Sequence, residues 1–256
     1  MSKRNRMRRR LRRGAYLLPS LFTIGNVLLG FYAVVRGLQG DFELAALLVA
    51  AAAVLDALDG RVARLTGTES EFGREFDSLA DVLTFGAAPA LLTHAWGLAD
   101  LGRIGWLVPL FYLVCCATRL ARYNVQSPQG DRRYFVGLPA PAAACAVAAL
   151  LLFAPEQDWK PWGNGLLLAS LLVLGALMVS TFRYVSFGNL DLRRRWSYRS
   201  AIVLAGLVLL LAYRPQGALL AAAVAYTAYP PLAWLAGRIR GNRGPAEAPG
   251  SEPRSR

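Results

Sequence analysis

Long apolar runs recur along the chain, and they restrict its fold more than any other feature. Hydrophobic residues make up 55% of the 256 positions, and each run approaches the length of about 20 residues that a helix needs to cross a bilayer. A backbone inside a bilayer must satisfy its own polar groups, so such runs predict transmembrane helices. The eight runs cover approximately residues 16–38, 42–63, 75–97, 103–123, 136–154, 164–185, 199–213 and 216–236. We therefore expect an all-α integral membrane protein with about eight transmembrane helices.

Basic residues are distributed unevenly between the connections. With the first residues placed in the cytosol, all but four of the 29 Lys and Arg side chains fall on the cytosolic side. Enrichment of cytosolic loops in Lys and Arg is the known orientation bias of membrane proteins. It predicts a multi-pass protein of the cytoplasmic membrane with both termini in the cytosol. The net charge of +13 is then explained by anionic lipid headgroups, and no nucleic-acid partner is expected.

Composition divides the chain into three parts. Residues 1–15 are strongly basic and are expected to lie on lipid headgroups as a cytosolic arm. Residues 16–237 hold all the apolar runs and form the expected transmembrane domain. Residues 238–256 are rich in Arg, Pro, Gly and Glu, a composition that predicts a disordered cytosolic tail.

Two pairs of aspartates interrupt the apolar pattern. Asp56 and Asp59 are three residues apart, and Asp77 and Asp81 are four apart, so the members of each pair share one face of a helix. The two runs that carry them are expected to be antiparallel neighbours, which brings both pairs to the same depth in the cytosolic leaflet. Ionised groups at membrane depth are costly, and four acids of one sign require a cation. The sequence therefore predicts a four-carboxylate cluster.

The chemistry of this cluster favours hard divalent cations. Oxygen ligands without Cys or His suit Mg²⁺, Mn²⁺ or Ca²⁺ better than zinc or copper. Four carboxylates can hold two such ions, and two-metal sites act on phosphates. Gly60 allows a ligand to approach the backbone, and Arg64 offers a guanidinium to a diphosphate. One alternative is a static ion-pair network with Arg61, Arg64 and Arg74. Another is a transporter of divalent cations or lipids, although the second half has no matching acid pair.

The acids belong to a longer pattern, D-x2-D-G-x2-A-R-x8-G-x3-D-x3-D, that runs from Asp56 to Asp81. This pattern resembles the signature of the CDP-alcohol phosphotransferase family at every fixed position. The resemblance implies six core helices followed here by two more, and two divalent cations, Mg²⁺ or Mn²⁺ with Ca²⁺ as a further option. It implies that the enzyme cleaves a CDP-linked donor, releases CMP and works as a homodimer, with its active site facing the cytosol.

The same resemblance assigns roles to individual residues. Asp56, Asp59 and Asp77 would be metal ligands, and Asp81 would be both a ligand and the base that deprotonates the acceptor hydroxyl. The expected contacts to the CDP moiety are Gly60, Arg64, Ser70 and Gly73, joined by Thr23 and by Ser20, which stands where the family often has Asn.

The flanking segments resemble the membrane-type phosphatidylserine synthases within that family. They read TIGNVLLGFYA at 23–33, RLARYN at 119–124 and YFVGLPAPAAA at 134–144. This resemblance implies transfer of a phosphatidyl group from CDP-diacylglycerol to the hydroxyl of L-serine. Transfer to glycerol phosphate or inositol phosphate, or from an archaeal ether-lipid donor, is the alternative within the family.

An amino-acid acceptor also needs a cation for its carboxylate. Arg119 and Arg122, with Asn124 close by, end the fourth run and are candidates for that carboxylate or for a lipid phosphate. Their alternative role is anchoring at the membrane surface. Arg183 and Tyr184 at the end of the sixth run form a second candidate set.

Overall fold

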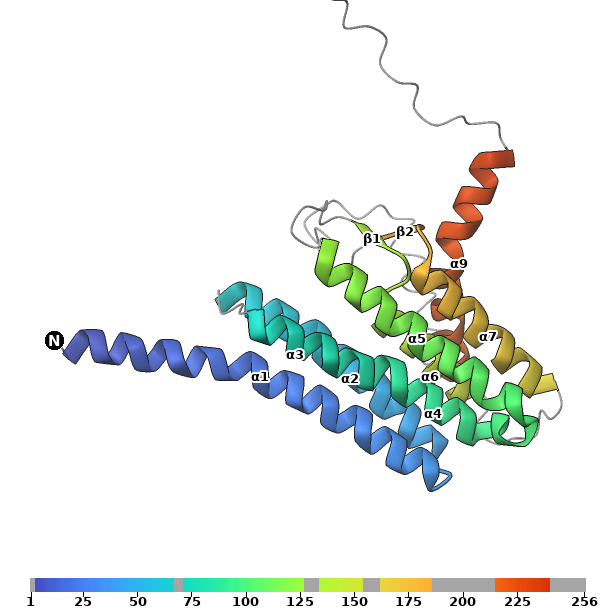
Figure 1. Cartoon of the computed structure of the whole chain (residues 1–256), viewed down its shortest axis with the longest axis horizontal. Helices are drawn as coiled ribbons and strands as arrows, with labels where there is room; N and C mark the ends of the chain where they lie inside the picture. Colours follow the sequence, from blue (N-terminus) through green and yellow to red (C-terminus); the bar gives the residue numbers. More distant parts are fainter. Residues whose placement is uncertain (1–2, 67–70, 127–133, 154–161, 186–214, 240–256) are drawn as a thin grey trace, which may run out of the picture.

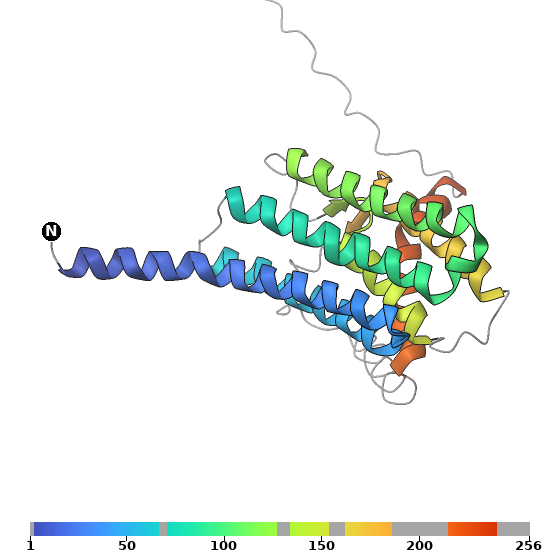
Figure 2. The same ribbon diagram turned by 60° about the horizontal axis from the view of Figure 1, so that its bottom comes forward.

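The computed structural model describes residues 3–66, 71–126, 134–153, 162–185 and 215–239 (Figure 1). Nearly all of these residues are helical, and most of the helices run side by side along one direction (Figures 1 and 2). The expected seventh run at 199–213 and most of the tail expected at 238–256 lie outside the described residues.

The first helix, α1, is the longest element. It spans Lys3–Leu38, 36 residues, so the basic residues expected as an arm continue without a break into the first apolar run. Its N-terminal part projects beyond the bundle (Figures 1 and 2). Its second half packs closely against α2 (Phe42–Thr66). The absence of a side chain at Gly25 allows this approach, since a Cβ there would lie only 2.9 Å from Cδ2 of Leu55.

The turn between α1 and α2 is tight and capped. Gly40 adopts a positive φ of 84°, a conformation that glycine accepts without strain. Asp41 forms an ion pair with Arg36, and its Oδ1 accepts a hydrogen bond from the Leu44 backbone N–H at 3.1 Å. The Leu44 N–H, and then Arg36, stabilise the charged carboxylate and lower the pKa of Asp41 below its usual value.

A continuous helical rod follows, but it is not a regular α-helix. It consists of α3 (Glu71–Asp81), the π-helical turn η1 (Val82–Ala87), α4 (Ala88–Thr93), the π-helical turn η2 (His94–Leu98) and the 3₁₀ turn η3 (Ala99–Leu101). Pro89 explains the first irregularity, because it has no N–H to donate to the carbonyl of Phe85 one turn earlier. The hydroxyl of Tyr112 donates to that carbonyl instead, at 3.0 Å.

The remaining described elements complete the bundle. They are α5 (Arg103–Gln126), α6 (Ala140–Phe153), α7 (Trp162–Val179) and α9 (Pro215–Ile239), together with the strands β1 (Tyr134–Val136) and β2 (Arg183–Val185). Helix α6 is rich in buried alanines, and such small residues allow α2 and α9 to approach it closely.

The strand pair corrects two expected boundaries and adds a short two-stranded ribbon to a fold that is otherwise helical, as expected. β1 and β2 are antiparallel, with Phe135 opposite Tyr184, so the fifth and sixth runs are not helical over their full predicted lengths. Gly137 has a φ of 81°, and Pro139 follows shortly after it, so helix α6 cannot extend back to residue 136. The backbone of Gly137 donates instead to the Phe182 carbonyl at 2.8 Å, which joins the two connections.

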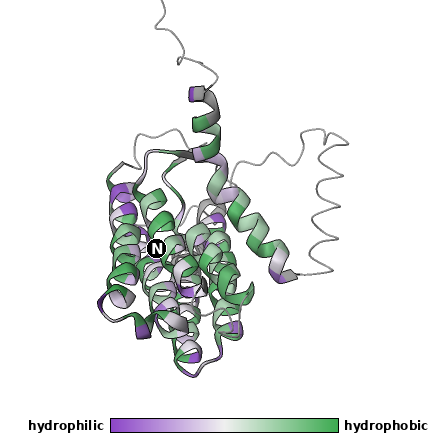
Figure 3. Cartoon of the chain, turned by 90° about the vertical axis from the view of Figure 1, so that its right-hand side faces the viewer, coloured by the Kyte–Doolittle hydropathy of each residue, from purple (hydrophilic) through white to green (hydrophobic). Residues whose placement is uncertain are grey.

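Four segments of the described chain are long and apolar enough to cross a membrane: Leu21–Leu38, Glu71–Leu101, Arg103–Val125 and Gln216–Leu235. Helices α6 and α7 contain shorter apolar stretches. Helix α2 begins with an apolar stretch and carries the first aspartate pair in its second half. Hydrophobic residues cover much of the surface of these helices (Figure 3). The chain is thus a largely helical membrane protein, while the count of eight spans and the orientation of the termini stay predictions.

Candidate active site

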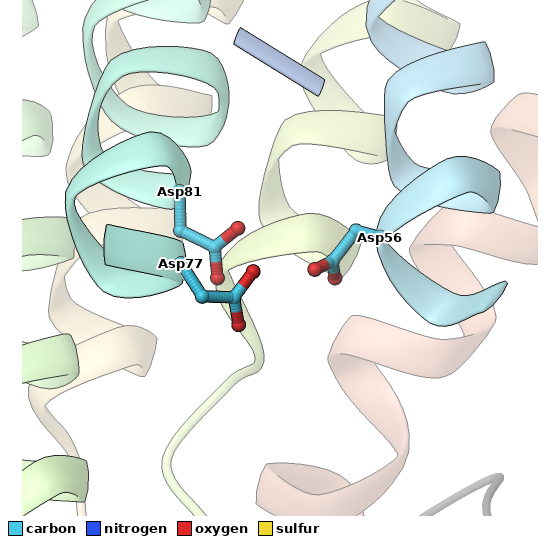
Figure 4. A group of neighbouring side chains, drawn as sticks. All are labelled: Asp56, Asp77 and Asp81. Atoms are coloured by element: carbon cyan, nitrogen blue, oxygen red, sulfur yellow. The ribbon is translucent and has the colours of Figure 1, made fainter. Parts of the chain in front are cut away.

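Three of the four aspartates come together between α2 and α3. One carboxylate oxygen from each of Asp56, Asp77 and Asp81 lies within 4.8 Å of the others. Asp77 and Asp81 project from one helix toward Asp56 on the opposite helix (Figure 4). The i, i+4 spacing in α3 puts its two acids on one face, and the antiparallel neighbour supplies the third.

Asp59 lies outside this group of three but next to it. It is 6% exposed and interacts electrostatically with Asp56 and Asp77. Its Oδ2 accepts a hydrogen bond of 2.8 Å from the hydroxyl of Thr23. Its buried Oδ1 has no hydrogen-bond partner among the described residues. The predicted four-carboxylate cluster is therefore a group of three with a fourth acid beside it.

This donor set fits divalent cations. Several carboxylates packed together without a bound positive charge repel one another, and a buried carboxylate oxygen without a partner is unfavourable. Hard cations that prefer oxygen ligands would relieve both problems. Each helix has a glycine near its acids: Gly60 follows Asp59, and Gly73 lies one turn before Asp77. A ligand can approach the backbone closely at a glycine.

Helix α1 contributes two polar side chains to the acids, and the sequence analysis assigned a role to only one of them. Thr23 was expected as a nucleotide contact, and in the structure it holds Asp59. Asn26 was missed. Its Nδ2 donates to Oδ1 of Asp81 at 3.4 Å, and it is 1% exposed. The available signal was spacing, since Thr23 and Asn26 are three residues apart on one face of an otherwise apolar helix.

The two candidate arginines of α5 differ in their surroundings. Arg119 is 7% exposed, interacts electrostatically with Asp56 and Asp81, and has an Nε without a partner among the described residues. Arg122 instead donates to backbone carbonyls of β1 and of the end of α7: Val136 at 3.1 Å, Met178 at 3.4 Å, Val179 at 3.0 Å and Ser180 at 3.2 Å. Arg122 is thus engaged in holding three elements together.

The other acceptor candidates are also engaged or only partly described. Asn124 donates to the Ser78 hydroxyl at 2.9 Å and to Glu75 at 3.4 Å, which ties the end of α5 to α3. Tyr184 is 0% exposed, and its hydroxyl donates to the Thr227 carbonyl on α9 at 3.1 Å. The side chain of Arg183 is outside the described part of the chain, as are those of Ser20 and Arg64 and all of Ser70.

Such a site, with clustered acids at one end of a helical membrane bundle, defines a class of metal-dependent enzymes that act on phosphate compounds. Residues 16–182 match the model of the CDP-alcohol phosphatidyltransferase family, and the chain belongs to that family.

Similar proteins narrow the class. A protein of Helicobacter pylori (strain J99) named CDP-diacylglycerol–serine O-phosphatidyltransferase is 39% identical over 222 residues, which cover 86% of this chain and 92% of the relative. A protein of the same name from Bacillus subtilis (strain 168) is 34% identical over 171 residues, 66% of this chain and 90% of the relative. An archaetidylserine synthase of Methanothermobacter thermautotrophicus is 36% identical over 137 residues, 53% of this chain and 58% of the relative.

Proposed function

We propose that this protein transfers a phosphatidyl group from CDP-diacylglycerol to the hydroxyl of L-serine, which gives phosphatidylserine and CMP. The observation that carries the proposal is the group formed by Asp56, Asp77 and Asp81 in a chain that shares most of its length with relatives named for this reaction. The archaetidylserine synthase differs from them in its lipid but is also named for serine, which supports serine as the acceptor.

In the proposed reaction, the serine hydroxyl attacks the phosphorus that bears diacylglycerol, and the bond from that phosphorus to CMP breaks. Asp81, to which the family resemblance assigns the role of general base, takes the hydroxyl proton; it is the second acid of α3 and accepts a hydrogen bond from Asn26 of α1. Asp56, Asp59 and Asp77 would hold two divalent cations, with Asp81 as a further ligand. Bound Mg²⁺ or Mn²⁺ would supply charge stabilisation for the diphosphate and for the departing CMP.

The nucleotide contacts and the topology belong to the same proposal. The CDP moiety would bind at the cytosolic side of the transmembrane domain, residues 16–237. The residues that would line it are Gly60, Arg64, Ser70, Gly73, Thr23 and Ser20. The active site would face the cytosol from the cytoplasmic membrane, with eight spans and both termini inside. Labelling of single cysteines placed at either end of the helices tests this orientation, and crosslinking in membranes tests the expected homodimer.

An acceptor competition assay tests the activity directly. Purified protein receives CDP-diacylglycerol and Mn²⁺ or Mg²⁺ together with serine, glycerol phosphate or inositol phosphate, and CMP release is measured. We expect release with serine, loss of release with EDTA, and recovery when the cation is restored. Release with glycerol phosphate alone would overturn the serine assignment, and no release with any acceptor would favour transport. A parallel arm with an ether-linked CDP donor tests the alternative that the archaeal relative suggests.

A further inference from the structure

Two side chains that interact with Asp81 each carry a buried polar atom without a partner among the described residues. Oδ1 of Asn26 is a hydrogen-bond acceptor, Nε of Arg119 is a donor, and neither has a partner among the described residues. Asn26 is 1% exposed and Arg119 is 7% exposed. Buried polar groups are nearly always paired, because leaving one unpaired forfeits the hydrogen bonds that water would make. Two such atoms around one carboxylate indicate a place prepared for a polar ligand.

Asn26 is held in a defined orientation. A carboxylate can only accept hydrogen bonds, so the contact with Asp81 must be made by the amide nitrogen, and the amide oxygen is left as an acceptor. The hydroxyl of Thr84, in the π-helical turn η1, donates to the backbone carbonyl of Asn26 at 3.1 Å. Gly30, one turn further along α1, makes this approach possible, because a Cβ there would lie 2.9 Å from Cα of Thr84.

Arg119 approaches from a different element. It lies on α5, which packs against the turn η1 directly after Asp81, and it interacts electrostatically with Asp81 and Asp56. Asp81 is therefore flanked by a neutral acceptor from α1 and by a cationic donor from α5. These are the groups that complement an ammonium and a carboxylate, respectively.

We propose that Asn26 and Arg119 form the recognition site for the zwitterionic end of an amino-acid acceptor. Oδ1 of Asn26 accepts a hydrogen bond from the α-ammonium, Arg119 binds the α-carboxylate, and the hydroxyl is thereby presented to Asp81. In serine these three groups are separated by only two carbon atoms, so their protein partners must lie close together, and both Asn26 and Arg119 interact with Asp81. The inference rests on the proposed function and adds residues that select the acceptor.

The test uses acceptors that lack one group each. Ethanolamine has the ammonium but no carboxylate, and 3-hydroxypropionate has the carboxylate but no ammonium. With the wild-type protein, CMP release from CDP-diacylglycerol gives kcat/KM for each acceptor, or an inhibition constant against serine where an analogue is not turned over. A hydrogen bond to a charged group predicts that each analogue is about ten- to a hundredfold poorer than serine.

Two variants assign the discrimination to residues. In Asn26→Ala, the preference for serine over 3-hydroxypropionate should fall about tenfold or more, while the preference over ethanolamine is retained. In Arg119→Lys, which keeps the charge but loses Nε, the preference over ethanolamine should fall instead. Asn164→Ala is the matched control: Asn164 is also a buried asparagine with an unpaired Oδ1, but it lies at the start of α7 and should change neither ratio.

The ratio of kcat/KM between two acceptors separates recognition from a structural effect, because a variant that merely misplaces Asp81 slows the reaction with all acceptors alike. Unchanged ratios in both variants would overturn the inference. Should Asn26→Ala fail to fold, the wild-type series still decides, since equal use or binding of serine and 3-hydroxypropionate would also overturn it. CMP release with glycerol phosphate but not serine is a different result, and it would reject the proposed function itself.

Discussion

The acid site and the strand connection both border α5, and they use polar groups in opposite ways. Around Asp56, Asp77 and Asp81, some buried donor and acceptor atoms find no partner in the described part of the chain. Around Arg122, the guanidinium is shared among four backbone carbonyls of β1 and α7. The two arginines of α5 show the contrast best, because Arg119 and Arg122 are one turn apart and differ mainly in whether the protein itself satisfies them.

This difference separates binding groups from structural ones. A buried polar group that the fold already satisfies contributes to stability, and redirecting it to a ligand would break those bonds. A buried polar group that the fold leaves unpaired gains a partner when a ligand arrives. Changes on the acid side should therefore affect activity with little effect on stability, and changes on the strand side should do the reverse.

The largest effect is expected for Asp81→Asn. Loss of a general base lowers turnover by about 10²- to 10⁴-fold, while the near-identical shape leaves the fold and CDP-diacylglycerol binding intact. CMP release, donor binding and the apparent melting temperature measure the three quantities. Glu71→Gln is the control, because Glu71 is an exposed acid in the first turn of the same helix. Wild-type turnover in Asp81→Asn would remove Asp81 as the base.

Arg122→Leu should have the opposite profile. It removes the donor to the Val136 and Val179 carbonyls and should destabilise the protein by about 2–3 kcal/mol, since hydrogen bonds from charged groups are among the stronger ones. The apparent melting temperature should fall clearly, and the serine preference of the folded fraction should stay the same. Arg103→Leu, an exposed change at the other end of α5, should have little effect. A changed acceptor preference in Arg122→Leu would move Arg122 into the binding site.

Gly137→Ala tests the strand connection through its backbone. Gly137 has a φ of 81°, and an added Cβ would collide with the Met178 carbonyl oxygen. A left-handed conformation costs a residue with a Cβ roughly 1–2 kcal/mol, and the collision adds to this. Gly165→Ala is the comparison, because Gly165 lies inside α7 with open space around it and the change should stabilise the helix by about 0.5–1 kcal/mol. Equal melting temperatures for the two variants would contradict the assigned strain.

The smallest effect is expected for Asp41→Asn, far from both regions. Asn can still cap α2, so only the charge and its pairing with Arg36 are lost. The lowered pKa of Asp41 means that its ionised form stabilises the fold above the unfolded-state pKa, and that this contribution disappears as pH falls through the folded-state pKa. The variant should therefore melt slightly below the wild type at pH 7, and the difference should shrink in acid. A difference that persists in acid would show that the charge is not the cause.

The acids could be predicted because their signal is local. Spacings of three and four residues, in apolar runs joined by a short connection, determine that Asp56, Asp77 and Asp81 meet. The roles of Arg119 and Arg122 could not be separated in this way, because they depend on which side chains and carbonyls surround each one after folding. Asn26 was missed because its one local signal, the three-residue spacing from Thr23, does not reveal that it meets Asp81.

The irregular parts of the fold also escaped prediction. The π-helical turn after Asp81 depends on Pro89, which cannot donate to the Phe85 carbonyl, and on the distant hydroxyl of Tyr112, which donates to that carbonyl instead. The strand β2 lies inside an apolar run that was expected to be helical, and β1 overlaps the start of another; the two strands pair with each other. Contacts with residues distant in the sequence thus override the local preference of these segments for regular helix.

The π-helical turn η1 has a consequence for how the rod formed by α3 and α4 can vary. A widened turn holds one residue more than an α-helix, and each residue of an α-helix advances the side chains by about 100° around its axis. The turn therefore acts as a phase shift between two halves of one rod, so that α3 can direct Asp77 and Asp81 toward Asp56 (Figure 4) while η1 and α4 direct Phe85 and Leu92 into the apolar core. Shortening this stretch by a single residue would leave a smoother helix whose two halves could no longer serve both surroundings at once.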